Sequence, residues 1–448
     1  MRRIKQILIL SCFFSTVSIA QEPTPADTLL LPELTKKAHD IVTLISSSNY
    51  AELAPMFDVS MAAALPEDKF HESWKMIQDQ VGAFQRQGNV RIERVTQYDI
   101  VYVTCQFQRA SLDIRMIFDS QGQIAGLLYM PSETATNFVS AYYVNKDTFQ
   151  THDITIGTGE WALPATLTIP NGSDAVPAIA LVHGSGPNDR DETVGPNKPF
   201  RDLAEGLATK GIAVLRYEKR TKQYPEKVIA MIDSLTVKEE TVDDAIEAVK
   251  ALKQTPGIGK VFVLGHSFGG TMIPRIAKGS MEIDGFIILA GMAKPLENTI
   301  QEQFNYIYLL DGVISPEEKA ELDTLDIKVA KVKTTDLSVS TPRNELPLGM
   351  PASYWLDLRG YEPAVAARDI YRPMLFLQGA RDYQVTKVDF EIWKNNLSSR
   401  KDVEFKLYPS LNHLFIEGEG KITPDEYGVF GHVSEEVIND IAAWVKSH

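Results

Sequence analysis

The chain has 448 residues, which suits roughly two or three domains, and 44% of them are hydrophobic, as in ordinary folded globular proteins. With 59 acidic against 45 basic residues, its net charge is −14 at pH 7. An acidic surface repels phosphate groups, so the charge argues against nucleic acid and anionic lipid as partners.

The N-terminus has the pattern of a secretory signal peptide, which we place at residues 1–20. Three basic residues lie within the first five, an apolar stretch runs from Ile7 to Ile19, and a small-residue site ends at Ala20. This stretch is too short to span a membrane, so we expect cleavage after Ala20. Lipoprotein processing at Cys12 is the alternative. The cleaved signal peptide predicts a periplasmic or secreted protein, and no later apolar run predicts a membrane span.

Residues 33–130 are expected to form a separate small α+β domain. Apolar residues recur at helical spacing as far as Phe84, and after Gly88 the period changes to two, which is typical of antiparallel strands. The expected strands are 90–96, 99–108, 111–118 and 123–129. Cys105 alternates with apolar residues and is expected to be a buried, inert thiol. The stretch resembles NTF2-like and cystatin-like modules, and residues 131–148 are expected to form a linker.

From residue 149 to residue 448 a different rhythm predicts an α/β domain. A hairpin over 150–156 and 162–169 precedes apolar strands that alternate with helical segments. The expected strands are 178–182, 212–217, 261–264, 285–290, 374–377 and 403–408, and the helices 199–210, 237–253, 270–278, 386–397 and 433–446. Apolar strands alternating with helices predict a doubly wound, mostly parallel sheet with helices on both faces.

One long interval interrupts this alternation. Residues 292–372 contain two helix-like stretches and a proline-rich piece between two predicted strands. Insertions of this length within an α/β sheet commonly cover a binding site, so we expect a helical lid here.

The stretch from Val261 to Gly270 predicts a nucleophile elbow. A short apolar strand runs into Gly265-His266-Ser267-Phe268-Gly269, and small residues follow where a helix can begin. Glycines at these places allow the sharp strand-to-helix turn that exposes a serine hydroxyl. Ser267 is therefore the candidate nucleophile.

A serine needs a base to take its proton and an acid to orient that base. His413 follows the strand 403–408 and is the candidate base; His432 is expected to be a surface or capping residue, and His448 is the terminus. Asp382 follows the strand 374–377 and is the candidate acid. Both lie just past the carboxyl ends of strands, where sites form in open α/β sheets.

The oxyanion that forms during acyl transfer needs two hydrogen-bond donors. One is expected to be the backbone N–H of Phe268, directly after the nucleophile. The other is expected from the glycine-rich loop His183-Gly184-Ser185-Gly186-Pro187, with Ser185 N–H as the candidate. His183 and His266 are expected to pack or hydrogen-bond rather than act as bases.

Together these residues resemble the α/β-hydrolase superfamily over residues 150–448. The stretch from His183 to Phe200 is similar to bacterial EstD-type carboxylesterases of the serine aminopeptidase-like group, which also have a small preceding domain. The resemblance implies hydrolysis of short acyl esters without a metal or organic cofactor. Asp189, Arg190 and Asp191 are expected to form an internally paired charged loop beside the site.

The sequence thus predicts a serine hydrolase that cleaves small-molecule carboxylic esters through an acyl-enzyme on Ser267. A serine aminopeptidase or an acyltransferase could use the same triad, and Glu302, Glu317 and Glu318 are available to bind a free amine. A binding protein with an idle triad is the alternative from another class.

Overall fold

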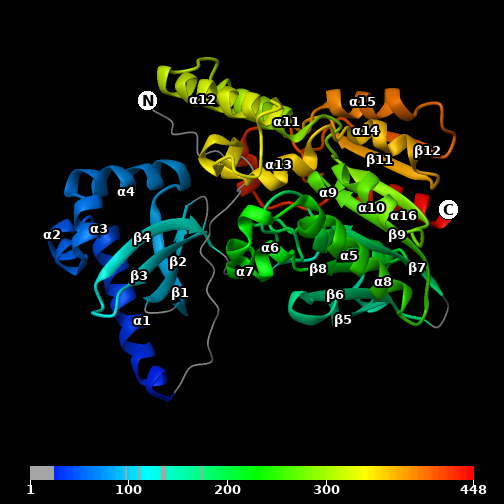
Figure 1. The fold of residues 1–448 in the computed structure, drawn as a ribbon. Helices are drawn as coiled ribbons and strands as arrows, with labels where there is room; N and C mark the ends of the chain where they lie inside the picture. The colour runs from blue at the N-terminus through cyan, green and yellow to red at the C-terminus, as the bar shows by residue number, and fades with distance from the viewer. Residues whose placement is uncertain (1–24, 96–97, 109–110, 133–137, 173–174) are drawn as a thin grey trace. The chain divides into compact units, whose positions relative to one another are not determined.

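The computed structural model describes residues 25–95, 98–108, 111–132, 138–172 and 175–448 (Figure 1). The predicted signal peptide, including Cys12, lies outside the described residues. The chain divides into two compact units, one ending at Phe138 and the other running from Val139 to His448. None of the helices in the described ranges is long and apolar enough to cross a membrane.

The first unit contains helices followed by an antiparallel sheet, as predicted. Its helices are α1 (Pro25–Ser46), α2 (Tyr50–Leu53), α3 (Val59–Ala64) and α4 (Glu67–Val81). The sheet has the order β1-β2-β3-β4, with β1 (Phe84–Val95), β2 (Tyr98–Phe107), β3 (Ser111–Phe118) and β4 (Ile124–Pro131). Cys105 is fully buried in its core, and burial raises the pKa of this thiol to about 12.

One expectation for this unit is wrong. Phe84 was expected at the end of a helix, but α4 ends at Val81 and β1 begins at Phe84. Between them Gly82 has φ +86°, a left-handed conformation that terminates helices and suits glycine. Strand β1 therefore starts several residues before the expected 90–96.

The second unit is built on an eight-stranded sheet of order β12-β11-β10-β9-β7-β8-β6-β5. Its strands are β5 (Phe149–Ile156), β6 (Leu163–Pro170), β7 (Val176–Val182), β8 (Ala213–Tyr217), β9 (Ile258–His266), β10 (Gly285–Leu289), β11 (Met374–Gly379) and β12 (Val403–Tyr408). β5 and β6 form the predicted antiparallel hairpin, β6 pairs antiparallel with β8, and all other neighbours are parallel. The predicted doubly wound, mostly parallel fold is confirmed.

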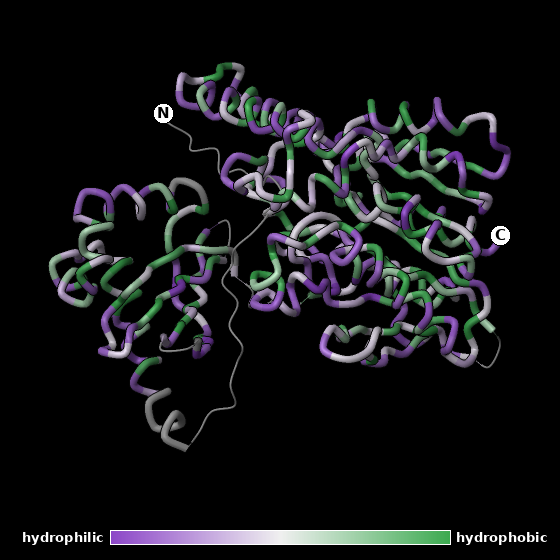
Figure 2. The backbone as a smooth tube through the Cα atoms, viewed as in Figure 1, coloured by the Kyte–Doolittle hydropathy of each residue, from purple (hydrophilic) through white to green (hydrophobic). Residues whose placement is uncertain are grey.

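Helices follow the strands of this sheet in alternation. They are α5 (Pro199–Thr209), α6 (Arg220–Gln223), α7 (Pro225–Ala230), α8 (Asp243–Lys253), α9 (Phe268–Thr271), α10 (Ile273–Gly279), α15 (Lys387–Leu397) and α16 (Glu435–Ser447). Phe262 of β9 packs against Trp444 of α16, with ring centroids 5.7 Å apart. The middle strands are predominantly hydrophobic (Figure 2), because helices shield them from water.

The long interval between β10 and β11 is helical. It contains α11 (Leu296–Tyr308), α12 (Pro316–Lys333), α13 (Ala352–Leu358) and α14 (Pro363–Ala366), which Figure 1 shows in yellow-green to orange. α12 begins with a capping box in which Ser315 and Glu318 satisfy each other's backbone N–H groups. Tyr354 of helix α13 is buried and packs near Phe268, the residue predicted to follow the nucleophile.

Candidate active site

Ser267 sits in a strained turn between β9 and α9. Its φ is 53° and its ψ −119°, a backbone conformation that residues other than glycine rarely adopt. The turn is held by a hydrogen bond from Ser267 N–H to the Leu289 carbonyl, at 2.8 Å. Strain of this kind is a feature of nucleophile elbows, as the sequence predicted.

The flanking glycines are required by close backbone contacts. A Cβ atom on Gly265 would overlap the backbone of Gly269, and a Cβ on Gly269 would overlap the carbonyl oxygen of Val182. Any larger residue at either position would push the turn away from the sheet. The spacing of the glycines around Ser267 thus reflects packing in this elbow.

Asp382 and His413 meet as a buried pair. His413 Nδ1 lies 2.6 Å from Asp382 Oδ2, and their side chains are 5% and 0% exposed. The aspartate also accepts hydrogen bonds from Gln378 Nε2 and from the N–H groups of Gln384 and Val385. An ionised carboxylate only accepts, so Nδ1 carries the proton and Nε2 remains free to act as a base.

Two other aspartates and a histidine of this unit are placed or paired differently. Asp402 pairs with Arg400, and Asp369 lies upstream of β11 in a short 3-10 helix. His432 was expected to be a surface or capping residue; it is one-fifth exposed and hydrogen-bonds to Asp202 at 2.9 Å. Asp382 and His413 are therefore the pair that the fold brings to the carboxyl edge of the sheet.

The predicted oxyanion loop lies against Ser267. A Cβ placed on Gly184 would be 3.1 Å from Ser267 Cβ and 3.6 Å from its Oγ, so the loop backbone contacts the serine. Gly184 N–H donates to Glu192 Oε1 at 2.5 Å and is occupied. No hydrogen bond within the described ranges occupies Ser185 N–H. Phe268 is the first residue of α9, where backbone N–H groups lack a partner within the helix.

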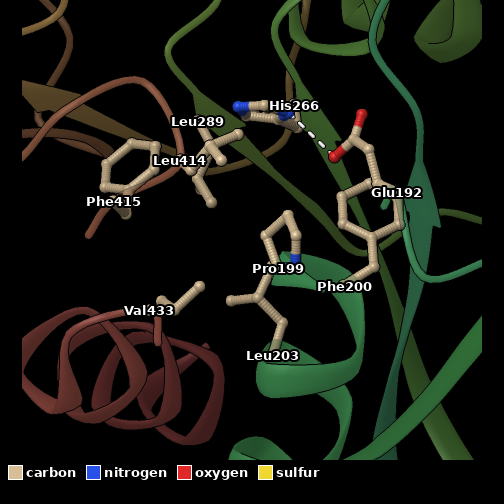
Figure 3. A pocket seen from close by; sticks show the side chains of 9 residues that line it. All are labelled: Glu192, Pro199, Phe200, Leu203, His266, Leu289, Leu414, Phe415 and Val433. Carbon is tan, nitrogen blue, oxygen red and sulfur yellow. Dashed lines mark hydrogen bonds and ion pairs between the residues drawn. The ribbon is translucent and has the colours of Figure 1, made fainter. Parts of the chain in front are cut away.

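A second histidine–carboxylate pair, Glu192 with His266, lies beside the elbow (Figure 3). His266 Nδ1 is 2.8 Å from Glu192 Oε2, and His266 Nε2 is 2.9 Å from the carbonyl oxygen of His413. Both side chains border a cavity of about 10 Å³ whose other lining residues are apolar. Glu192 has φ 51°, so it too is held in a strained conformation.

The charges of this pair support each other. Burial lowers the pKa of His266, but the carboxylate of Glu192 outweighs burial, and the pKa is raised above its ordinary value. Burial alone would raise the pKa of the Glu192 carboxyl, but the contacts with His266 outweigh burial, so the pKa of Glu192 is lowered. The sequence indicated His266 as a hydrogen-bonding residue and assigned Glu192 no role. The only feature of the sequence that could have indicated Glu192 is its position in the loop after β7.

His183 is a packing residue, as expected. Its ring contacts those of Phe200 and Tyr217, with centroids 5.0 and 5.1 Å away. Burial lowers the pKa of His183 to about 4, so the ring is neutral near pH 7.

The charged loop next to the site is paired, but mostly with residues outside it, so the expected internal pairing is found only in part. Arg190 contacts Glu218 at 2.7 Å and Asp153 at 3.1 Å, and Asp191 pairs with Arg216 and Lys198. Asp189 accepts from the N–H and hydroxyl of Thr193. The part of the chain that the structure describes has no group of three or more His, Cys, Asp or Glu side chains arranged to hold a metal ion.

Comparison with known proteins finds two matching families and a curated relative. Residues 196–323 match a family described as "Serine aminopeptidase, S33", and residues 38–127 match one described as "Protein of unknown function (DUF3887)". The curated relative "Esterase EstD" of Thermotoga maritima is 40% identical over 410 residues, which cover 92% of this chain and 95% of the relative.

Two solved esterases are similar at much lower identity. Est1E from Butyrivibrio proteoclasticus is 14% identical with a TM-score of 0.42, covering 66% of this chain and 99% of the other. The Pyrococcus furiosus esterase PF2001 is 16% identical with a TM-score of 0.42, covering 70% and 97%. Identity of 40% along nearly the whole of both chains decides the relationship: the chain belongs to the EstD family of esterases, which have the α/β-hydrolase fold.

Proposed function

We propose that the protein is an exported serine esterase that cleaves carboxylic esters of small acyl groups through an acyl-enzyme on Ser267. The proposal rests on the buried hydrogen bond between His413 Nδ1 and Asp382 Oδ2, which is 2.6 Å long. This pair lies at the same edge of the sheet as Ser267. The short-acyl preference draws on the likeness of residues 183–200 to EstD-type enzymes. Export draws on the signal pattern of residues 1–20.

In the proposed reaction, His413 Nε2 takes the Ser267 hydroxyl proton as Oγ attacks the ester carbonyl. The N–H groups of Ser185 and Phe268 stabilise the negative oxygen that develops. His413 then gives its proton to the leaving alcohol, and the acyl group remains on Oγ. Water, deprotonated by His413, attacks this acyl-enzyme and releases the acid. Asp382 keeps the imidazole in the tautomer that these proton transfers need.

The test is an acyl-length series of p-nitrophenyl esters, from acetate upward, on wild type and Ser267→Ala. We expect the shortest esters to give the highest kcat/KM and the variant to lose fluorophosphonate labelling. Ester hydrolysis that survives in Ser267→Ala would rule out the proposed nucleophile. Labelling that persists unchanged in that variant would favour a binding protein with an idle triad.

Export is tested separately. We expect mass spectrometry of the secreted protein to find a mature N-terminus at Gln21.

The match to a serine aminopeptidase family supports a second candidate, aminopeptidase activity. A peptidase should present free carboxylates to the substrate amine. Two of the three predicted acids are engaged elsewhere: Glu302 pairs with Lys294, and Glu318 caps α12. This favours the esterase. Faster cleavage of aminoacyl-p-nitroanilides than of p-nitrophenyl acetate would reverse that preference.

A further inference from the structure

A buried lysine also contacts the predicted oxyanion loop. Lys219 follows the carboxyl end of β8, and its side chain is only 3% exposed. Its Nζ donates to the carbonyl oxygen of Gly184 at 2.8 Å. The Asn188 amide reaches the same oxygen at 3.2 Å. Gly184 is thus held by a carboxylate on its N–H and an ammonium on its carbonyl.

The lysine is paired as well as buried. Its Nζ lies 2.7 Å from Glu240 Oε1, and the Glu240 side chain is 2% exposed. The other carboxylate oxygen accepts the hydroxyl of Tyr354, from α13, at 2.6 Å. Removing two charges from water is costly, and well-packed apolar residues would serve stability at least as well. A buried ion pair that also touches the active-site loop therefore suggests a role beyond stability.

The chemistry of the peptide group indicates that role. The Gly184 carbonyl and the Ser185 N–H belong to one conjugated peptide unit. A cation on the oxygen draws electron density from the nitrogen, which makes the N–H a stronger donor. Gly184 N–H is already taken by Glu192, whereas no hydrogen bond within the described ranges occupies Ser185 N–H, the donor predicted for this loop.

We propose that Lys219 is a positioning residue for the ester hydrolysis: by binding the Gly184 carbonyl, it orients and polarises the Ser185 N–H that stabilises the oxyanion. The inference rests on the proposed function and extends it to a residue that does not touch substrate. Through Glu240 and Tyr354 the same network reaches α13, whose Tyr354 ring lies 6.3 Å from the ring of Phe268, the other predicted donor.

Lys219→Met tests the proposal, because it removes the ammonium and keeps the apolar stem. The double variant Lys219→Met/Glu240→Gln guards against misfolding, because it leaves no unpaired buried carboxylate and keeps an acceptor for Tyr354. In both we expect kcat on p-nitrophenyl acetate to fall about tenfold, less than the roughly hundredfold loss on deleting a whole oxyanion donor. KM should stay within about twofold, because the oxyanion exists only in the transition state.

A methyl trifluoromethyl ketone gives the second readout, since its adduct with Ser267 carries an oxyanion. Its inhibition constant should rise about tenfold, in parallel with the loss of kcat. The matched control is Asp244→Asn, which breaks the neighbouring buried ion pair with Arg220, 2.5 Å long. It should lower the melting temperature and leave both kcat and the inhibition constant near wild type.

Three results would overturn the inference. One is a folded double variant whose kcat matches wild type. Another is a parallel loss in the Asp244→Asn control, which would mean that the ion pairs act only through stability. A third is loss of kcat without weaker ketone binding. A wild type without Ser267-dependent ester hydrolysis would instead overturn the proposed function itself, and the inference with it.

Discussion

The ring of His266 donates from Nε2 to the backbone carbonyl of His413, at 2.9 Å, so the residue before the nucleophile holds the main chain of the base. The two rings lie 4.7 Å apart. A carbonyl oxygen only accepts, so His266 Nε2 carries a proton. Its Nδ1 faces Glu192, and with an ionised carboxylate there the ring is an imidazolium. One buried ion pair thus joins the loop after β7, the elbow and the loop of the base.

Glu192→Gln should remove a pH-dependent part of the stability. The pKa of His266 is raised above 6.5, so its contribution is complete below that pH and is lost as pH rises through the folded-state value. We expect the unfolding free energy of wild type to fall more than that of the variant between about pH 6 and about pH 9. Denaturant titrations at both pH values measure this difference. Equal losses of unfolding free energy in wild type and variant would show that the pair of Glu192 and His266 does not hold an extra proton in the folded protein.

The catalytic rate of Glu192→Gln should also fall, by roughly tenfold, because the loop of Gly184 and the backbone of His413 lose a common support. Steady-state kinetics on p-nitrophenyl acetate measure this. Unchanged kcat would limit the pair to stability.

Asp382→Asn should lower kcat by about four orders of magnitude. The asparagine amide donates to His413 Nδ1, which leaves the proton on Nε2 and removes the base. Asp202→Asn is the matched control, because the buried Asp202 also pairs with a histidine, the one-fifth exposed His432, at 2.9 Å. The control should keep kcat near wild type. Equal losses in the two variants would contradict the assignment of Asp382.

Gly184→Ala should impair catalysis more than folding. The added Cβ would lie 3.1 Å from Ser267 Cβ and 3.2 Å from Glu192 Oε1, so the loop or the serine must shift. Contacts of this length require a shift of a few tenths of an ångström, so we expect kcat to fall by less than the roughly hundredfold that a displacement of 1 Å at a reacting group costs. Gly259→Ala in β9 is the control, since its nearest contact would be an ordinary 3.7 Å. The prediction fails if kcat is the same in both variants while melting curves show folded protein.

His183→Phe should flatten the acid limb of the stability curve. His183 stays neutral in the folded protein down to about pH 4 but gains a proton near 6.5 once unfolded, so wild type loses stability as pH falls. The shift corresponds to about 3 kcal/mol of unfolding free energy. Phenylalanine keeps the ring contacts with Phe200 and Tyr217. Unfolding at about pH 7.5 and about pH 4.5 measures the change, and an unaltered acid limb would assign it to other groups.

The sequence alone determined the α/β architecture and the position of Ser267, Asp382 and His413 on one edge of the sheet. Apolar strands, glycine turns and helical periods are local signals, and parallel strands bring their carboxyl ends together. Phe84 was misplaced because a helical period continued by chance through Gly82, whose left-handed backbone ends the helix.

Only the tertiary structure showed which buried charged residues contact the loops around Ser267 and His413. Glu192 and His266 are 74 positions apart, Gly184 and Lys219 are 35, and His266 and His413 are 147. No local pattern distinguishes these acids and bases from the many that remain in water. Their roles depend on burial, which strengthens each ionic contact and requires each charge to be paired, and burial is decided by the packing of distant segments.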